Sequence, residues 1–133
     1  MYVAVYGTLK KGYGNNRLMD PRGFTLVGSF VSVDKFHMTS GGGFPIVYKD
    51  MKQHHVKVEI YRVDDKAYLS SVDSLEGHPT WYRREPVEFV PADMSGGDIV
   101  IAEMYIQDKP RSTPMYYNVR VNNNIAEWAR SHD

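Results

Sequence analysis

The sequence predicts an α+β protein built on a small mixed β-barrel of about six strands, with helices packed outside it. Six short segments have strand character, glycine-rich turns separate several of them, and two segments show helical periodicity. Strands and helices do not alternate as they do in a parallel α/β chain, so a closed or nearly closed barrel fits their order better. A chain of 133 residues is expected to form one domain, residues 1–133.

The predicted strands are short runs of apolar, β-branched and aromatic residues. Val56, Val58 and Ile60 alternate with more polar neighbours, which is typical of a half-buried strand. Pro45 lacks a backbone N–H, so its strand should lie at a sheet edge or begin after the proline. The six segments are residues 2–6, 24–33, 44–48, 56–61, 86–90 and 99–106.

Two helices are predicted, over residues 66–76 and 122–130, with a turn or short helix at residues 15–19. Asp64 or Asp65 can cap the first helix, and Gly77 followed by Pro79 predicts where it ends. In the second helix, Ile125, Trp128 and Ala129 would share one face.

The composition excludes several classes of function. Sixteen Lys and Arg balance sixteen Asp and Glu, which argues against nucleic-acid binding through phosphate neutralisation. No apolar run approaches the ~18 residues that span a bilayer, so no membrane association is expected. The absence of cysteine excludes thiolate chemistry, and the five histidines lack metal-ligand spacing. We expect a cytoplasmic protein, monomeric or weakly dimeric, without metal or cofactor.

The first predicted helix carries a carboxylate on its apolar face. At about 100° per residue, Glu76 lies in the same arc as Val72, because it follows that residue by four positions. Desolvation would raise the pKa of such a carboxylate, which suits a general acid or base. Alternatively, Glu76 turns to solvent at the helix end or pairs with Arg83 or Arg84. The remaining apolar residues of the arc are Tyr68, Leu69 and Leu75.

The first predicted strand ends in a glycine turn, residues 6–12. Gly7 permits a sharp turn and close approach of a ligand to the backbone. Successive N–H groups in such a turn can form an anion or oxyanion site. The spacing matches neither a P-loop nor a dinucleotide-binding loop, so an ordinary turn stays an alternative.

The two segments together resemble the γ-glutamylcyclotransferase-like family, which includes AIG2-like proteins and γ-glutamylamine cyclotransferases. One match is the run Val5-Tyr6-Gly7-Thr8-Leu9-Lys10-Lys11-Gly12, followed by Asn15 or Asn16. The other comprises Glu59-Ile60-Tyr61, then Val72-Asp73-Ser74-Leu75-Glu76-Gly77-His78-Pro79, then Tyr82 and Arg84. Gly43-Phe44-Pro45 is similar to the family's glycine-proline strand start, and the segment after Ile106 matches weakly.

The resemblance implies a β-barrel enzyme that cleaves a γ-glutamyl amide and releases 5-oxoproline. By this resemblance Glu76 is the general acid and base, and Tyr6, Gly7, Thr8 and Leu9 bind the glutamyl unit through backbone N–H groups. Tyr82 would shape the pocket, and Arg84 would stabilise it or meet a carboxylate. The substrate supplies its own nucleophile, the α-amine, which agrees with a chain without cysteine. The alternative function is a binding protein that holds a small ligand or a partner on the same barrel without turnover.

Overall fold

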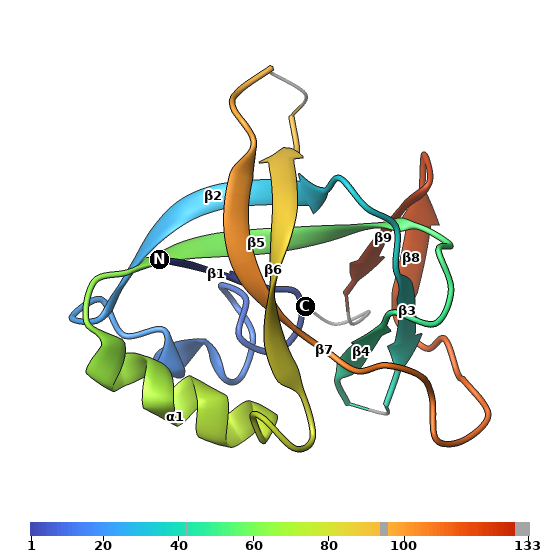
Figure 1. The fold of residues 1–133 in the computed structure, drawn as a ribbon, viewed down its shortest axis with the longest axis horizontal. Helices are drawn as coiled ribbons and strands as arrows, with labels where there is room; N and C mark the ends of the chain where they lie inside the picture. The colour runs from blue at the N-terminus through green and yellow to red at the C-terminus, as the bar shows by residue number, and fades with distance from the viewer. Residues whose placement is uncertain (42, 94–95, 130–133) are drawn as a thin grey trace.

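The strands of the protein close into a mixed β-barrel, seen in a computed structural model that describes residues 1–41, 43–93 and 96–129 (Figure 1). Within these residues, β1 pairs with both β5 and β7 and thereby closes the ring. The β1–β7 pair is parallel, and the other pairs of the ring are antiparallel. Around the barrel the strands are β1 (Tyr2–Val5), β7 (Val100–Ile106), β6 (Arg83–Pro91), β2 (Phe24–Ser32) and β5 (His55–Val63). The predicted fold class is confirmed.

Two hairpins extend the barrel at the end away from the helix (Figure 1). The first consists of β3 (His37–Ser40) and β4 (Pro45–Tyr48), which pair with each other as a separate two-stranded sheet. β4 includes Pro45 and forms one side of this two-stranded sheet, so the predicted edge position of the proline-containing strand is confirmed. The second consists of β8 (Val119–Asn122) and β9 (Ile125–Trp128), and β9 runs parallel to β5.

The core has two layers, and β1 contributes to both. Ala4 and Tyr6 point into the barrel, whereas Val3 and Val5 pack on the side that the helix covers. This alternation explains why the first strand is a continuous apolar run: both of its faces are buried. The same alternation on β5 points Val56, Val58 and Ile60 into the barrel.

The helix α1 (Lys66–Glu76) has the predicted bounds. The Asp65 side chain accepts a hydrogen bond from the Ala67 N–H at its start, and Gly77 ends it in a left-handed conformation. Leu69 and Val72 are buried against the barrel, but Leu75 is 45% exposed. The buried face of the helix is therefore narrower than the apolar arc predicted from the sequence. The 3-10 helix η1 (Asn16–Leu18) confirms the expected short helix.

The predicted C-terminal helix over residues 122–130 is wrong; the part of it that the structure describes belongs to the β8–β9 hairpin. Asn123 and Asn124 have φ values of 52° and 64° and form its turn, a conformation that asparagine tolerates better than most residues. Ala126 and Trp128 both point into the barrel, so the spacing that matters is two rather than three or four. Arg130 lies outside the described residues.

Replacing Asn123 by valine is expected to lower the free energy of unfolding by about 1–2 kcal/mol, because a β-branched residue is strained at positive φ. Asn123→Gly should leave stability unchanged or higher. The order would be reversed in a helix, where glycine costs more than valine. Urea unfolding of the two variants decides between hairpin and helix.

Candidate active site

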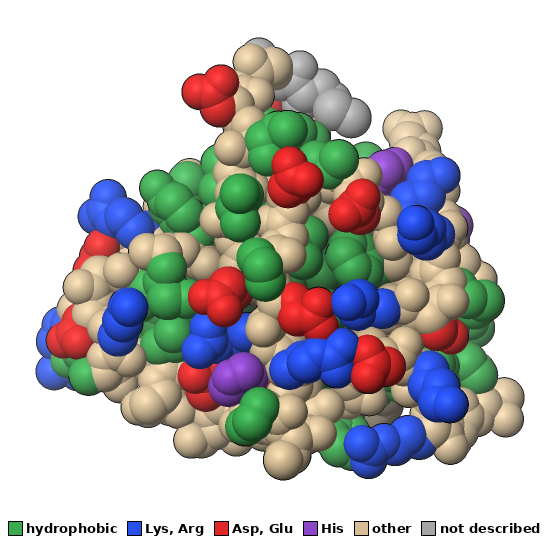
Figure 2. All heavy atoms as spheres, viewed as in Figure 1, with side chains coloured by type: hydrophobic (Ala, Val, Ile, Leu, Met, Phe, Trp, Pro, Cys, Tyr) green, Lys and Arg blue, Asp and Glu red, His purple; other side chains and the backbone are tan. Residues whose placement is uncertain are grey.

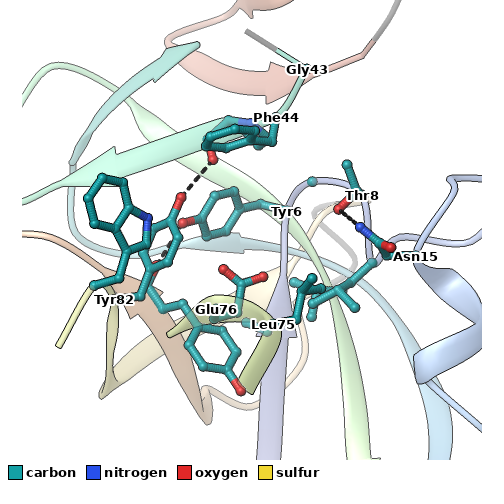
Figure 3. Close-up of a pocket in the computed structure, with 15 residues that line it drawn as sticks. Tyr6, Thr8, Asn15, Gly43, Phe44, Leu75, Glu76 and Tyr82 are labelled. Carbon is teal, nitrogen blue, oxygen red and sulfur yellow. Dashed lines mark hydrogen bonds between the residues drawn. The ribbon is translucent and has the colours of Figure 1, made fainter. Parts of the chain in front are cut away.

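A pocket of about 350 Å³ opens at the mouth of the barrel, between the glycine turn and the end of α1 (Figure 3). Three other segments complete it: the start of β4, the chain between α1 and β6, and one residue of β7. Segments far apart in the sequence therefore meet here. The lining consists of Ala4, Val5, Tyr6, Gly7, Thr8, Leu9, Asn15, Gly43, Phe44, Pro45, Leu75, Glu76, Trp81, Tyr82 and Tyr105.

Glu76 is the last residue of α1, and its carboxylate points across the pocket toward Tyr6 (Figure 3). Within the described part of the chain, no donor hydrogen-bonds to this carboxylate and no cation pairs with it. Burial alone raises the pKa of Glu76 to about 7. A carboxylate with this pKa exchanges a proton readily near neutral pH, as a general acid or base must.

The glycine turn is held in place by side chains on both sides of it. The Lys11 N–H donates to Glu59 Oε1 at 2.8 Å, and Asn15 Nδ2 donates to Thr8 Oγ1 at 2.9 Å. Asn16 Nδ2 donates to the Leu9 carbonyl at 2.8 Å. The turn is therefore fixed before any ligand arrives, as preorganised binding requires.

Two backbone donors of the turn stay available to a ligand. The N–H groups of Thr8 and Leu9 donate to no acceptor among the described residues, whereas the Lys10 N–H closes a turn onto the Gly7 carbonyl. Gly7 itself packs against the Pro45 ring: a Cβ added to it would lie 2.6 Å from Pro45 Cδ. Glycine is thus required here by this close packing.

Aromatic side chains form the walls of the pocket. The Tyr82 hydroxyl donates to the Pro45 carbonyl at 3.1 Å, and the Tyr6 hydroxyl donates to the Tyr105 carbonyl at 2.7 Å. Burial chiefly, and secondarily the charge of the neighbouring Glu76, raise the pKa of Tyr6 and Tyr82, so both hydroxyls stay protonated. The walls are neutral, which leaves Glu76 as the only titratable carboxylate lining the pocket among the described residues.

Arg84 lies outside the pocket lining, which argues against its predicted contact with substrate. Its Nε donates to Asp73 Oδ1 at 2.7 Å, and its Nη1 donates to Glu103 Oε1 at 2.8 Å. The Tyr105 hydroxyl donates to the same Asp73 oxygen at 2.6 Å. Asp73 lies one turn before Glu76 on α1, so Arg84 anchors the helix that carries the Glu76 carboxylate. This contact is one way in which Arg84 can stabilise the pocket, as expected.

Replacing Arg84 by methionine is expected to lower the free energy of unfolding by about 2–4 kcal/mol, because Asp73 and Glu103 would lose their partner. The side chains of Arg84 and Asp73 are only 16% and 21% exposed, so water cannot fully compensate. Arg83→Met is the matched control: Arg83 pairs with the exposed Asp108, and its replacement should cost much less stability than that of Arg84. Equal losses in urea unfolding would contradict the anchoring role.

Besides Glu76, six site residues were predicted, and five of them line the same pocket as Glu76: Tyr6, Gly7, Thr8, Leu9 and Tyr82. Phe44, Leu75, Trp81 and Tyr105 also line it and were not predicted as site residues. Gly43-Phe44-Pro45 and Asn15 carried a signal, since they match the family's motifs. Tyr105 carried none, because its contacts depend on strand pairing. No group of three or more potential metal ligands occurs among the described residues.

The closed barrel, its glycine turn and the partly buried carboxylate define a class of small barrel proteins with a pocket for a small molecule. The model of the γ-glutamyl cyclotransferase, AIG2-like family matches residues 3–126. The chain belongs to this family, and the resemblance noted from its motifs is confirmed. Among the described helices, none has the length and apolar character needed to cross a membrane.

Individual relatives agree with this assignment. A Methanocaldococcus jannaschii protein named as a candidate γ-glutamylcyclotransferase is 36% identical over 91 residues, covering 67% of this chain and 72% of its own. The γ-glutamylaminecyclotransferase of Rattus norvegicus is 31% identical over 114 residues, covering 78% and 76%. The crystal structure of a Mus musculus AIG2-like protein superposes with a TM-score of 0.70 at 26% identity, covering 92% and 97%. The family is one of enzymes, as expected.

Proposed function

We propose that this protein cleaves γ-glutamyl amides by cyclisation, releasing 5-oxoproline and a free amine. The observation that carries the proposal is the Glu76 carboxylate, which lies in the pocket without donor or counter-ion among the described residues and has a pKa near 7. The names of the relatives support the reaction class.

In the proposed reaction the nucleophile is the α-amine of the substrate's own glutamyl unit. Glu76 takes a proton from the α-ammonium, and the amine nitrogen attacks the γ-carbonyl carbon to close a five-membered ring. The carbonyl oxygen becomes an oxyanion in the tetrahedral intermediate. Glu76 then returns the proton to the leaving nitrogen as the carbon–nitrogen bond breaks. It takes a second proton from the ring nitrogen, which becomes the neutral N–H of 5-oxoproline, and passes that proton to the released amine or to water. Ring closure within one molecule avoids the entropy cost of bringing two reactants together.

The glycine turn would stabilise the charge that develops in this reaction. Thr8 and Leu9 line the pocket, and their N–H groups, which donate to no acceptor among the described residues, would donate to an oxyanion or to the substrate's α-carboxylate. Tyr6 and Tyr82 would shape the pocket around the glutamyl chain and exclude water. A pocket of about 350 Å³ suits a substrate of this size.

The test is to incubate the purified protein with a panel of γ-glutamyl amines and γ-glutamyl amino acids and to quantify 5-oxoproline by mass spectrometry. We expect release from at least one compound. Free glutamate in place of 5-oxoproline would show hydrolysis, and binding of the panel without any product would favour the alternative of a binding protein.

A further inference from the structure

A second pocket, of about 230 Å³, adjoins the first and shares Trp81 with it. It lies between the chain that follows α1 and the end of β7 with the loop after it. The side chain of Trp81 is 44% exposed and takes part in both pockets. The two pockets therefore meet at Trp81.

The second pocket carries an excess of hydrogen-bond donors and positive charge. Its lining includes Lys109 and Arg111, and neither forms a salt bridge in the described part of the chain. The Arg111 guanidinium stacks over the Trp81 ring at 5.0 Å. Figure 2 shows Lys and Arg side chains over the end of β7 and the loop that follows, with acidic side chains among them.

The other charges of this pocket are already paired. Arg83 binds both Glu85 and Asp108, so the acidic group of the pocket is neutralised by its neighbour. Gln107 is 7% exposed, and its side-chain amide nitrogen has no hydrogen-bond partner among the described residues. Lys109, Arg111 and the Gln107 amide are therefore donors without a paired acceptor among the described residues, and an anionic group would suit them.

We propose that this second pocket binds the leaving group of the substrate and selects one that carries a carboxylate, so that the substrates are γ-glutamyl amino acids. The carboxylate pairs with Arg111 and Lys109, and the apolar part of the leaving group lies on Trp81. Arginine suits this position because its planar guanidinium binds a carboxylate through two hydrogen bonds. This assignment rests on the proposed cyclisation, since that reaction supplies the leaving group.

The test compares two substrates that differ only in the carboxylate, γ-glutamylalanine and γ-glutamylethylamine. We expect kcat/KM to be at least about tenfold higher for γ-glutamylalanine. Arg111→Gln should raise KM for γ-glutamylalanine about tenfold without changing KM for γ-glutamylethylamine, and Arg111→Lys should restore part of the loss. Lys66→Gln, which removes a charge at the opposite end of α1, is the control and should change neither.

Binding without turnover separates this proposal from the proposed function. The Glu76→Gln variant is titrated with both compounds while tryptophan fluorescence is followed. Trp128 is fully buried, so the expected signal comes from the exposed Trp81. Tighter binding of γ-glutamylalanine, lost in Glu76→Gln/Arg111→Gln, supports the subsite even if the wild type releases no 5-oxoproline. Equal KM values for the two substrates, unaffected by Arg111→Gln, would overturn the subsite while the cyclisation stands.

Discussion

Replacing Glu76 by glutamine is expected to lower kcat for 5-oxoproline release by about 100- to 10,000-fold with little change in KM. Glutamine has nearly the same shape as glutamate, so the pocket and the end of α1 should be preserved, but it cannot accept or return a proton. The measurement is steady-state kinetics on the best compound of the γ-glutamyl panel. Glu88→Gln, which removes an exposed carboxylate of β6, is the control and should keep full activity.

The pH dependence follows from the same carboxylate. Because burial raises the pKa of Glu76 to about 7, kcat/KM of the wild type should fall about tenfold per unit as pH drops below 7. Any residual activity of Glu76→Gln should not show this decrease of kcat/KM below pH 7. A wild-type profile that is flat between pH 5 and 8, or a Glu76→Gln variant with more than a tenth of wild-type activity, would contradict the assigned role.

The loss of activity should come with a gain in stability, and the sign follows from linkage. A carboxyl whose pKa is higher in the folded state than in the unfolded state favours unfolding once the unfolded chain ionises. The loss of stability caused by Glu76 is absent below about pH 4.5, grows as pH rises from 4.5 to 7, and is constant above pH 7. The free energy of unfolding of Glu76→Gln should therefore exceed that of the wild type by up to about 3 kcal/mol at pH 8, and the two should be equal at pH 4.

The fold was predictable where local signals agreed with tertiary packing. At α1, the Asp65 cap, the apolar spacing and Gly77 all point to one helix, and its bounds match the structure. At the C-terminus the apolar spacing suggested a helix because Ile125 and Trp128 lie three residues apart. Two consecutive asparagines at positive φ were the competing turn signal, and pairing of β9 with β5 decided the outcome. β3 was missed because three of its four residues, His37, Thr39 and Ser40, are polar, and only the folded chain shows their burial and their pairing with β4.

The candidate site shows the same division. Glu76 was found because a carboxylate within an apolar arc is a local anomaly, and the glycine turn because its residues are contiguous. The positions of Trp81 and Tyr105 depend on how distant segments meet, and no spacing reveals them. Arg84 was expected to stabilise the pocket or to meet a carboxylate, and only the fold shows that its partners, Asp73 and Glu103, lie on α1 and β7. Sequence identifies the reactive groups here, and the barrel determines which side chains surround them.

Replacing Gly7 by alanine is expected to lower kcat/KM about 100-fold, because the turn that presents the Thr8 and Leu9 N–H groups must move. The added Cβ would lie 2.6 and 2.7 Å from Pro45 Cδ and Cγ, which is too close for any rotamer to relieve. Either the turn or the start of β4 must shift, and we expect a loss of about 1–3 kcal/mol in the free energy of unfolding as well. Kinetics and urea unfolding measure the two effects.

Gly14 provides the matched control in the same turn region. No atom lies within 4 Å of a Cβ added there, and its φ is outside the left-handed range. Gly14→Ala should therefore keep full activity and raise stability by about 0.4–1 kcal/mol, since alanine restricts the unfolded chain. If instead Gly14→Ala lost activity as Gly7→Ala does, general rigidity of the turn would explain the result better than the contact with Pro45.

The contact itself can be tested by a double-mutant cycle. Pro45→Ala removes the ring that Gly7 packs against and keeps the backbone carbonyl that accepts the Tyr82 hydroxyl. If the clash is the cause, Gly7→Ala should cost much less activity and stability in the Pro45→Ala background than in the wild type, a coupling of about 1–2 kcal/mol. Additive losses would show that contact with the Pro45 ring is not the cause, because removal of the ring would then have no bearing on the alanine at position 7.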